Sequence, residues 1–393
     1  MSVLKFTPKI EEKNFFKSYK KHIILGIISV VLITIILLYC FNSTFRNFFT
    51  LYIFRKKVTQ DNLTTISLNE DESSFVYAYD KYIVVLNKGI LYTYNSSGNV
   101  VSGNEVTISS PIFSSNNRFL ALAENNGDTI YLISGSNIIW QGNVEGKISK
   151  INVNNNGYIS VILTGTSYKS IVVSFDAKGK ELFKTYLSST TAIDMDISND
   201  NKYLSIAEVD YSGAISKSMI KTISIEKASS DPSNSVIYTY TNENNSLIAK
   251  INFGSKNILA CVYDDSLHYL DISGRQDFEI IKYTNQNNFA DIELKNSCMY
   301  SENNSFGFSS NTNVNITNIP NNNTSIYTLK GGIKSIYCYN EKIAINNGSE
   351  IHFIGLNGWL LKKYSSLSEI NTIILGDSIA GIVYKDKIEI IQF

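Results

Sequence analysis

The feature of this 393-residue sequence that most limits its fold is a repeated unit in which a polar turn precedes a short, almost wholly apolar segment. Four plain copies and then four weaker ones begin, in chain order, at Asp80, Asn116, Asn155, Asn199, Lys256, Ser297, Glu341 and Asp377. Their mean spacing of about 42 residues is typical of the four-stranded blade of a β-propeller. The sequence therefore predicts an all-β fold built as an eight-bladed β-propeller, with seven blades as the alternative.

In several repeats a second strand follows and ends in a tight turn. The turns contain the side chains Asn95, Asp176 and Asp271 and the glycines Gly98, Gly179, Gly274 and Gly358. An Asn or Asp side chain at such a place hydrogen-bonds the turn backbone, and glycine adopts the positive φ that the turn requires. We therefore assign these acidic side chains a structural role.

Blades of a propeller stack face to face, so strands inside a blade are covered on both sides and lack strict alternation. Residues 82–86 and 119–123 fit such inner strands, and residues 180–186 fit a more polar outer strand. Two strands at 379–384 and 387–393 have no outer strand after them, whereas residues 63–69 form a spare strand before the first repeat. We predict that these segments pair and close the ring, which removes an exposed sheet edge.

Residues 23–41 carry no charged side chain. About 20 apolar residues span the hydrocarbon core of a bilayer, so this stretch predicts one transmembrane helix at 22–41. It follows a short tail, 1–21, and precedes a juxtamembrane linker, 42–61, and the propeller, 62–393. The linker contains Phe45, Phe48 and Phe49, aromatic residues typical of a membrane interface.

Lysines gather on the N-terminal side of this helix, at Lys9, Lys13, Lys17, Lys20 and Lys21, whereas Arg46, Arg55 and Lys56 follow it. By the positive-inside rule we expect a single-pass plasma-membrane protein with a cytoplasmic N-terminus and an extracytoplasmic propeller. The inverted topology is the alternative. A cleaved signal peptide is disfavoured because the apolar run is long and ends in bulky residues.

The four cysteines form no C-x-x-C pair. We expect Cys261, Cys298 and Cys338 to be buried thiols, and Cys40 to be an apolar residue of the helix, since Tyr39 before it does not fit a lipidation site.

The formal net charge is zero, so no basic surface supports binding to nucleic acid. The residues also predict no catalytic, cofactor-binding or metal site. His268 and His352 occupy equivalent points of their repeats, and Asp264 and Asp265 lie in a turn. The acids Asp194, Asp196 and Asp200 lack the glycine and distal glutamate of a calcium loop.

The phrases S-S-N-N-R-F-L-A-L-A from Ser114 and S-N-D-N-K-Y-L-S-I-A from Ser198, with D-A-K-G-K-E-L from Asp176, resemble the repeats of WD-repeat and quinoprotein-like propellers. The chain lacks the adjacent cysteines of a quinone site. With its tail, anchor and repeat, it is similar to an uncharacterised family of membrane-anchored clostridial propeller proteins, over about residues 60–393. The resemblance implies a propeller in the cell envelope and no assigned activity.

Residues 210–218, 228–246 and 301–325 stretch the repeats and predict long loops. Tyr211, Tyr238 and Tyr240 lie in them and are candidate partner-binding residues, because tyrosine is enriched at interfaces. We expect a membrane-tethered binding or scaffolding module that meets the bilayer through its helix and an envelope protein or glycan through its head. The alternative is an envelope enzyme acting on a glycan or peptide.

Overall fold

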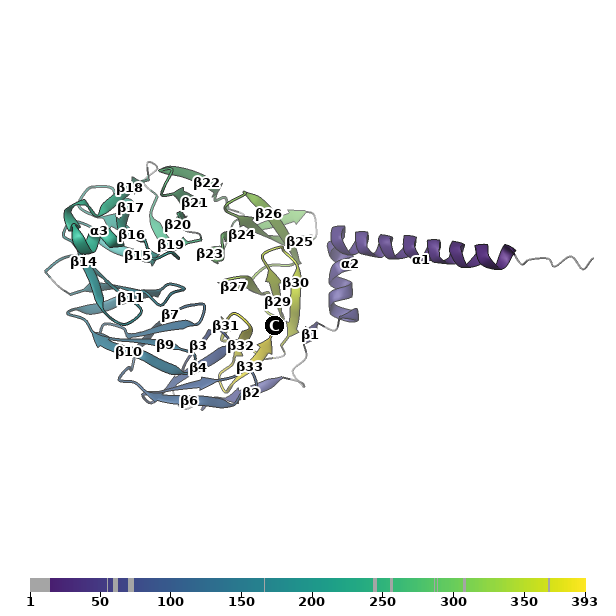
Figure 1. Ribbon diagram of the computed structural model, residues 1–393, viewed down its shortest axis with the longest axis horizontal. Coiled ribbons are helices and arrows are strands. Elements are labelled where there is room, and N and C mark those ends of the chain that lie inside the picture. Colours follow the sequence, from purple (N-terminus) through teal and green to yellow (C-terminus); the bar gives the residue numbers. More distant parts are fainter. Residues whose placement is uncertain are drawn as a thin grey trace, which may run out of the picture. The chain divides into compact units, whose positions relative to one another are not determined.

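The computed structural model describes residues 15–54, 56–58, 63–69, 74–165, 167–242, 246–254, 257–285, 287, 289–306, 309–366 and 368–393. The chain divides into two compact units, Met1–Lys56 and Lys57–Phe393. The first is helical and the second is built from β-sheets (Figure 1).

Helix α1 (Phe15–Phe41) includes the stretch His22–Phe41, which is long and apolar enough to cross a membrane. The linker expected at 42–61 is helical in its first half. The Asn42 side chain accepts a hydrogen bond from the Phe45 N–H and caps α2 (Ser43–Phe48), which continues into the π-helical turn η1 (Phe49–Ile53). Strand β1 (Lys57–Val58) already belongs to the second unit, where it pairs with β30 (Leu360–Ser365).

The second unit is a ring of eight sheets, one for each predicted blade (Figure 1). Blades 1 to 4 comprise, from the inner to the outer strand, β3 (Phe75–Tyr79), β4 (Tyr82–Asn87), β5 (Ile90–Tyr94) and β6 (Val100–Glu105); β7 (Pro111–Asn116), β8 (Phe119–Glu124), β9 (Thr129–Ser134) and β10 (Asn137–Asn143); β11 (Lys147–Val153), β12 (Ile159–Thr164), β13 (Ser170–Phe175) and β14 (Glu181–Leu187); and β15 (Thr191–Ile197), β16 (Tyr203–Asp210), β17 (Lys217–Ser224) and β18 (Val236–Thr241).

Blades 5 to 8 comprise β19 (Ile248–Phe253), β20 (Ile258–Tyr263), β21 (Ser266–Asp271) and β22 (Gln276–Lys282); β23 (Ala290–Leu294), β24 (Ser297–Phe306), β25 (Ser309–Asn318) and β26 (Asn323–Lys330); β27 (Ser335–Tyr339), β28 (Lys342–Asn346), β29 (Glu350–Gly355) and β30 (Leu360–Ser365); and β31 (Thr372–Leu375), β32 (Ile379–Val383), β33 (Lys387–Gln392) and β2 (Thr64–Ser67). The eight-bladed propeller is thus confirmed.

Ring closure occurs as predicted. Strand β2, from the start of the unit, pairs antiparallel with β33 at the C-terminus, and Ile66 lies opposite Ile388. Both side chains are buried in an apolar cluster shared by blades 8 and 1. The first and last parts of the unit are therefore held in one sheet.

Blade stacking explains why the repeated strands are apolar on both faces. In β12, Val161 and Leu163 pack in a cluster with blade 2, whereas Ile162, between them, packs in a cluster with blade 4. The expectation that these strands are the inner ones was wrong by one position. Strands β4 and β8 are second in their blades, and the innermost strands are the more polar ones before them, because those line the centre of the ring.

The predicted turns are largely confirmed. Asn95, Asp176 and Asp271 each accept hydrogen bonds from turn backbone N–H groups. Gly98, Gly179 and Gly358 have φ of 73°, 81° and 70°, but in the Asp271 turn the positive φ falls on Arg275 (52°) instead of Gly274. Cys261, Cys298 and Cys338 are buried free thiols, as expected, and burial raises the pKa of Cys298 to about 12.

Two of the three predicted long loops were wrong. The segment 228–246 contains the second half of α3 (Ile225–Ser230), a 3-10 turn at Pro232–Asn234 and the outer strand β18. In the segment 301–325, residues 301–306, 309–318 and 323–325 belong to β24, β25 and β26, whose Asn, Ser and Thr residues extend long strands, and residues 307–308 lie outside the described residues. Polar side chains suit exposed strand faces as well as loops, so composition alone did not separate the two. Residues 211–216 do form a hairpin loop.

Ring closure predicts how the C-terminus contributes to stability. Deleting residues 388–393 removes most of β33 and leaves β2 without a partner, so cooperative thermal unfolding is expected to shift to lower temperature or disappear. Circular dichroism or calorimetry measures this. A truncated protein as heat-stable as the full chain would contradict closure through β33.

A matched pair of substitutions in β2 tests the effect of side-chain burial on stability without shortening the chain. Ile66→Ala removes a side chain that is 3% exposed and should cost about 2–5 kcal/mol of unfolding free energy. Thr65→Ala, at the adjacent exposed position, should stay within about 0.5 kcal/mol.

Candidate functional site

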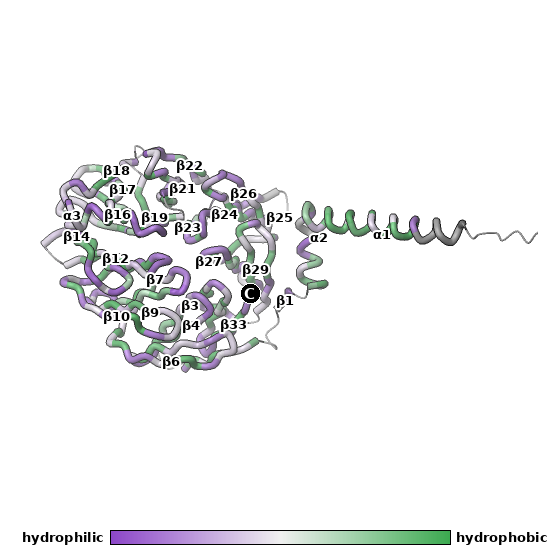
Figure 2. Tube along the Cα trace, in the orientation of Figure 1, coloured by the Kyte–Doolittle hydropathy of each residue, from purple (hydrophilic) through white to green (hydrophobic). Residues whose placement is uncertain are grey.

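A central cavity of about 500 Å³ lies inside the ring of blades. It is lined by residues of the innermost strands β3, β7, β11, β15, β19, β23 and β27 and of the turns that follow them. Figure 2 shows hydrophilic segments of β7, β19, β23 and β27 around this centre. The turns contribute Asn117, Asn155, Asn199, Lys295 and Asn340, so the cavity wall there is rich in amide groups.

Four successive innermost strands end in the same four-residue pattern, in which polar and apolar residues alternate. The patterns are K-I-N-V at 150–153, D-M-D-I at 194–197, K-I-N-F at 250–253 and D-I-E-L at 291–294. The polar members, which we call the charged arc, are Lys150, Asn152, Asp194, Asp196, Lys250, Asn252, Asp291 and Glu293. The first position alternates in charge from blade to blade.

A β-bulge precedes the first position in three of these strands. The pairing register shifts between Ile148 and Lys150 in β11, and equivalent shifts occur just before Asp194 and Lys250. A bulge re-aims the side chains that follow it. The repeated bulges thus give the charged arc a common geometry.

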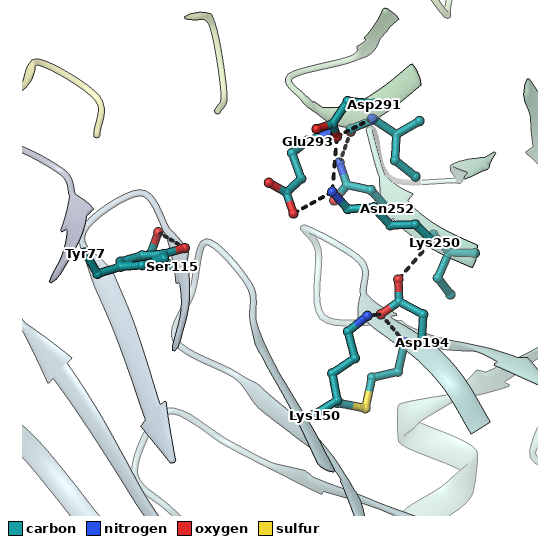
Figure 3. A network of polar contacts seen from close by, with 11 residues as sticks. Tyr77, Ser115, Lys150, Asp194, Lys250, Asn252, Asp291 and Glu293 are labelled. Atoms are coloured by element: carbon teal, nitrogen blue, oxygen red, sulfur yellow. Dashed lines mark hydrogen bonds and ion pairs between the residues drawn. The ribbon is translucent and has the colours of Figure 1, made fainter. Parts of the chain in front are cut away.

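Ion pairs in the charged arc join neighbouring blades (Figure 3). Lys150 Nζ lies 2.7 Å from Asp194 Oδ1, and Lys250 Nζ lies 3.1 Å from Asp291 Oδ1 and 2.7 Å from Glu293 Oε1. Although burial alone would lower it, the two adjacent carboxylates hold the pKa of Lys250 above its usual value. Each of the two lysines is therefore paired with a carboxylate of the next blade.

Asp196 differs from the other acids of the charged arc. Its side chain accepts hydrogen bonds from the backbone N–H groups of Phe253 (2.6 Å) and Ile197 (2.9 Å). The ion pairs found among the described residues include none to Asp196, which is only 5% exposed. Burial raises its pKa to about 7, and the nearby Asp194 carboxylate contributes in the same direction.

The side of the cavity formed by blades 1, 2 and 7 is aromatic. Tyr77 stacks on Phe113 with ring centroids 5.0 Å apart, and Tyr339 also lines the cavity. We call these three residues the aromatic wall. Ser115 donates a weak hydrogen bond to the Tyr77 hydroxyl, and burial raises the pKa of Tyr77 to about 12. Figure 3 shows Tyr77 and Ser115 across the central space from Lys150 and Asp194.

The three tyrosines singled out in the sequence lie away from this cavity, on blade 4. Tyr211 is 53% exposed in the loop between β16 and β17. Tyr238 and Tyr240 lie two residues apart on β18, half-buried against the core between blades 4 and 5. The Tyr240 hydroxyl donates to Asp277 of blade 5, so its polar end is already engaged within the propeller.

The structure also brings together Ser266, His268 and Asp277, which sequence spacing did not connect. Ser266 Oγ lies 3.0 Å from His268 Nε2, and His268 Nδ1 lies 2.9 Å from Asp277 Oδ1. Burial opposes ionisation of Asp277, but hydrogen bonds from His268 and Tyr240 lower its pKa overall. These contacts have the order of a hydrolase triad.

Burial argues against catalysis at this triad. Ser266 is 2% exposed, and its hydroxyl donates to Asp265 at 2.7 Å. The repeat-equivalent His352 is similarly buried and hydrogen-bonded to Tyr327 at 2.7 Å and to Glu350. His352 thus contacts the outer strand of the preceding blade directly, and His268 is linked to that of its preceding blade through Asp277, which accepts from Tyr240.

The remaining acids named from the sequence have local partners. Asp194 accepts from the Ile251 N–H of blade 5 in addition to Lys150. Asp200 accepts from Ser198 in its own turn, and Asp264 accepts from the Leu247 N–H. Among the described residues no group of three or more His, Cys, Asp or Glu side chains is placed to hold a metal ion.

A family model matches residues 54–393, which is most of the chain and the whole propeller. The chain belongs to the family of unknown function DUF5711. This agrees with the uncharacterised propeller family that the repeats resemble. No curated protein shows significant sequence similarity to this chain.

Solved propellers share the fold. Sqt1 of Chaetomium thermophilum, bound to the N-terminus of ribosomal protein L10, aligns with a TM-score of 0.54 and 10% identity over 86% of this chain and 100% of that one. The dihydro-heme d1 dehydrogenase NirN aligns with a TM-score of 0.52 and 10% identity over 84% of this chain and 76% of that one. One of these propellers binds a polypeptide and the other is an enzyme, so the fold alone does not decide the function.

The His268 network predicts a structural phenotype. His268→Ala leaves Asp277 without its principal partner and should lower the free energy of unfolding by about 1–3 kcal/mol. His352→Ala, the repeat-equivalent change, should cost a similar amount. Chemical denaturation of both variants measures this, and a fluorophosphonate probe should leave Ser266 unlabelled. Labelling of Ser266 that His268→Ala abolishes in a folded protein would instead establish a hydrolase.

Proposed function

We propose that this protein is a membrane-tethered, extracytoplasmic binding module that holds part of an envelope partner, a protein or glycan, in the central cavity of its propeller and catalyses no reaction of its own. The observation that carries the proposal is the cavity itself. Seven innermost strands converge on it, and four of them carry repeat-equivalent polar side chains. Concave sites lined by a few placed polar groups beside apolar surface are the usual ligand sites of proteins.

The tether is supported by two features of the first unit. The stretch His22–Phe41 has the length and composition of a membrane span. The following segment exposes Phe48, Tyr52 and Phe54, with exposed fractions above one half for each side chain. Aromatic side chains of this kind gather at membrane interfaces.

We also propose that the protein catalyses no reaction, because the groups that could act as nucleophiles or bases are ion-paired or buried. In the charged arc the lysines are ion-paired and therefore poor nucleophiles or bases. The Ser266 hydroxyl is buried away from the cavity lining. A binding module needs only complementary shape and charge at its surface.

Photo-crosslinking tests the binding site. With p-benzoylphenylalanine at Asn155 or Asn199, in turns that line the cavity, we expect a discrete crosslinked product in living cells. The matched control is Thr239, which is exposed on the outer strand β18 and should give no such product. Equal crosslinking from all three positions, or none from the two cavity positions, would contradict a partner in the cavity.

Protease access tests the topology. A cleavage site inserted in the exposed loop at residues 211–216 should be cut in intact cells stripped of their wall, while a cytoplasmic marker protein stays intact. The lysine excess before the span predicts this orientation. Cleavage that requires lysis would invert the topology, and a mature N-terminus beyond Cys40 would show that the span is a cleaved signal.

A further inference from the structure

We propose that the group bound in the cavity is a primary ammonium, carried by a lysine side chain of a partner polypeptide, with Asp196 and Glu293 as its carboxylate partners. This inference rests on the proposed function, because it names the chemistry that the same cavity recognises.

One acid of the cavity is left without a cationic partner in the described part of the chain, which favours a cationic ligand. All three lysines that line the cavity lie within 4.0 Å of a carboxylate: Lys150 pairs with Asp194, Lys250 with Asp291 and Glu293, and Lys295 with Glu341. Asp291 and Glu341 lie outside the cavity lining, whose own charged residues are these three lysines and the three acids Asp194, Asp196 and Glu293. Each lining lysine thus already has a carboxylate partner, and among the described residues Asp196 is the lining acid for which no ion pair is found.

Hydrogen-bond acceptors are also left over in the cavity. The Oδ1 atoms of Asn152 and Asn155 are buried and have no hydrogen-bond partner in the part of the chain that the structure describes. Both residues line the cavity, and Asn152 occupies in blade 3 the position that Asp196 occupies in blade 4. An ammonium group has three donors and no acceptor, so it matches a site with one carboxylate and spare amide oxygens.

The shape of the site favours a lysine side chain over a ring-borne amine. Asp196 is 5% exposed, so only a slender, unbranched group reaches its carboxylate, whereas Glu293, with a side chain 52% exposed, is reached more easily. The asparagines of the surrounding turns supply donors and acceptors that can pair with the peptide backbone on either side of the lysine.

The site also predicts a pH dependence. The charged residues on the strands around Asp196 are Asp194 on its own strand, Lys150 on β11, Lys250 on β19, and Asp291 and Glu293 on β23. Its pKa of about 7 means that the carboxylate becomes mostly ionised only above that pH. A lysine ammonium, with a pKa of about 10.4, stays charged throughout, so affinity should rise about tenfold between pH 6 and pH 8.

The test uses the full-length protein in lipid nanodiscs and calorimetric titration. The probes are the capped pentapeptide acetyl-Gly-Ser-Lys-Ser-Gly-amide, its analogue with Gln in place of Lys, and glucosamine. We expect the Lys peptide to bind at least tenfold more tightly than the Gln peptide and than glucosamine, and more tightly at pH 8 than at pH 6. Equal affinity of the two peptides, or tighter binding of glucosamine, would overturn the lysine assignment.

Three variants locate the contact. Asp196→Asn and Glu293→Gln should each weaken binding of the Lys peptide at least fivefold, and Asp196→Asn should also remove the pH dependence. Glu369→Gln makes the same charge change at a side chain that is 87% exposed outside the cavity, and should leave binding unchanged. If Asp196→Asn fails to fold, Glu293→Gln decides the question alone.

The inference can fail while the proposed function stands. Crosslinks from Asn155 and Asn199 together with no preference for the Lys peptide would retain the binding module and reject the ammonium ligand. Failure of both would reject the cavity as a binding site.

Discussion

The structure depends on apolar contact between consecutive blades. The second and third strands of each blade bury side chains on both faces, one set against the preceding blade and the other against the following blade. A single blade would expose both of these faces, so no blade is expected to be stable alone. The chain gains full burial only when the ring closes, which is why the pairing of β2 with β33 matters more than its four-residue length suggests.

Closure also determines what the centre of the ring contains. The innermost strands converge there, and their centre-facing residues have no second blade to pack against. In blades 3 to 6 these positions carry the charged arc, whose side chains bond to the next blade: Asp194 and Asp196 accept from the backbone of β19, and Asn252 donates to the Ile292 carbonyl. Buried ion pairs contribute little net stability but are costly to break singly. The arc therefore fixes the alignment of neighbouring blades. Polar groups able to bind a ligand are left at Asp196 and Asn152 of the arc and at Asn155 in the turn after β11.

Much of the fold could be predicted from the sequence because its determinants are local and repeated. The turn before each second strand, the Asx side chains at Asn95 and Asp176, and the spare segment that becomes β2 were all visible in the order of residues. The long loop predicted at 228–246 was wrong. Strand β18 lies in this segment, and its exposed, polar residues resemble those of a loop.

The candidate site was missed, although a signal was present. The patterns K-I-N-V, D-M-D-I, K-I-N-F and D-I-E-L stand directly before the polar turns, and aligning the repeats on those turns would have placed their polar residues at equivalent positions. What no spacing shows is which strand faces the centre of the ring. The contact of Ser266, His268 and Asp277 likewise depends on the register between β21 and β22, the two outer strands of blade 5.

The most direct test of the central claim is the rate at which a cysteine at Asn199 reacts with a membrane-impermeant maleimide. Cys40 is an exposed free thiol and is first replaced by serine, whereas Cys261, Cys298 and Cys338 are buried and give a low background. If a partner occupies the cavity outside the cell, Asn199→Cys should react at least tenfold more slowly in intact cells than in the purified protein, whereas Thr239→Cys should react at the same rate in both. Equal rates for Asn199→Cys in cells and in the purified protein would contradict the account.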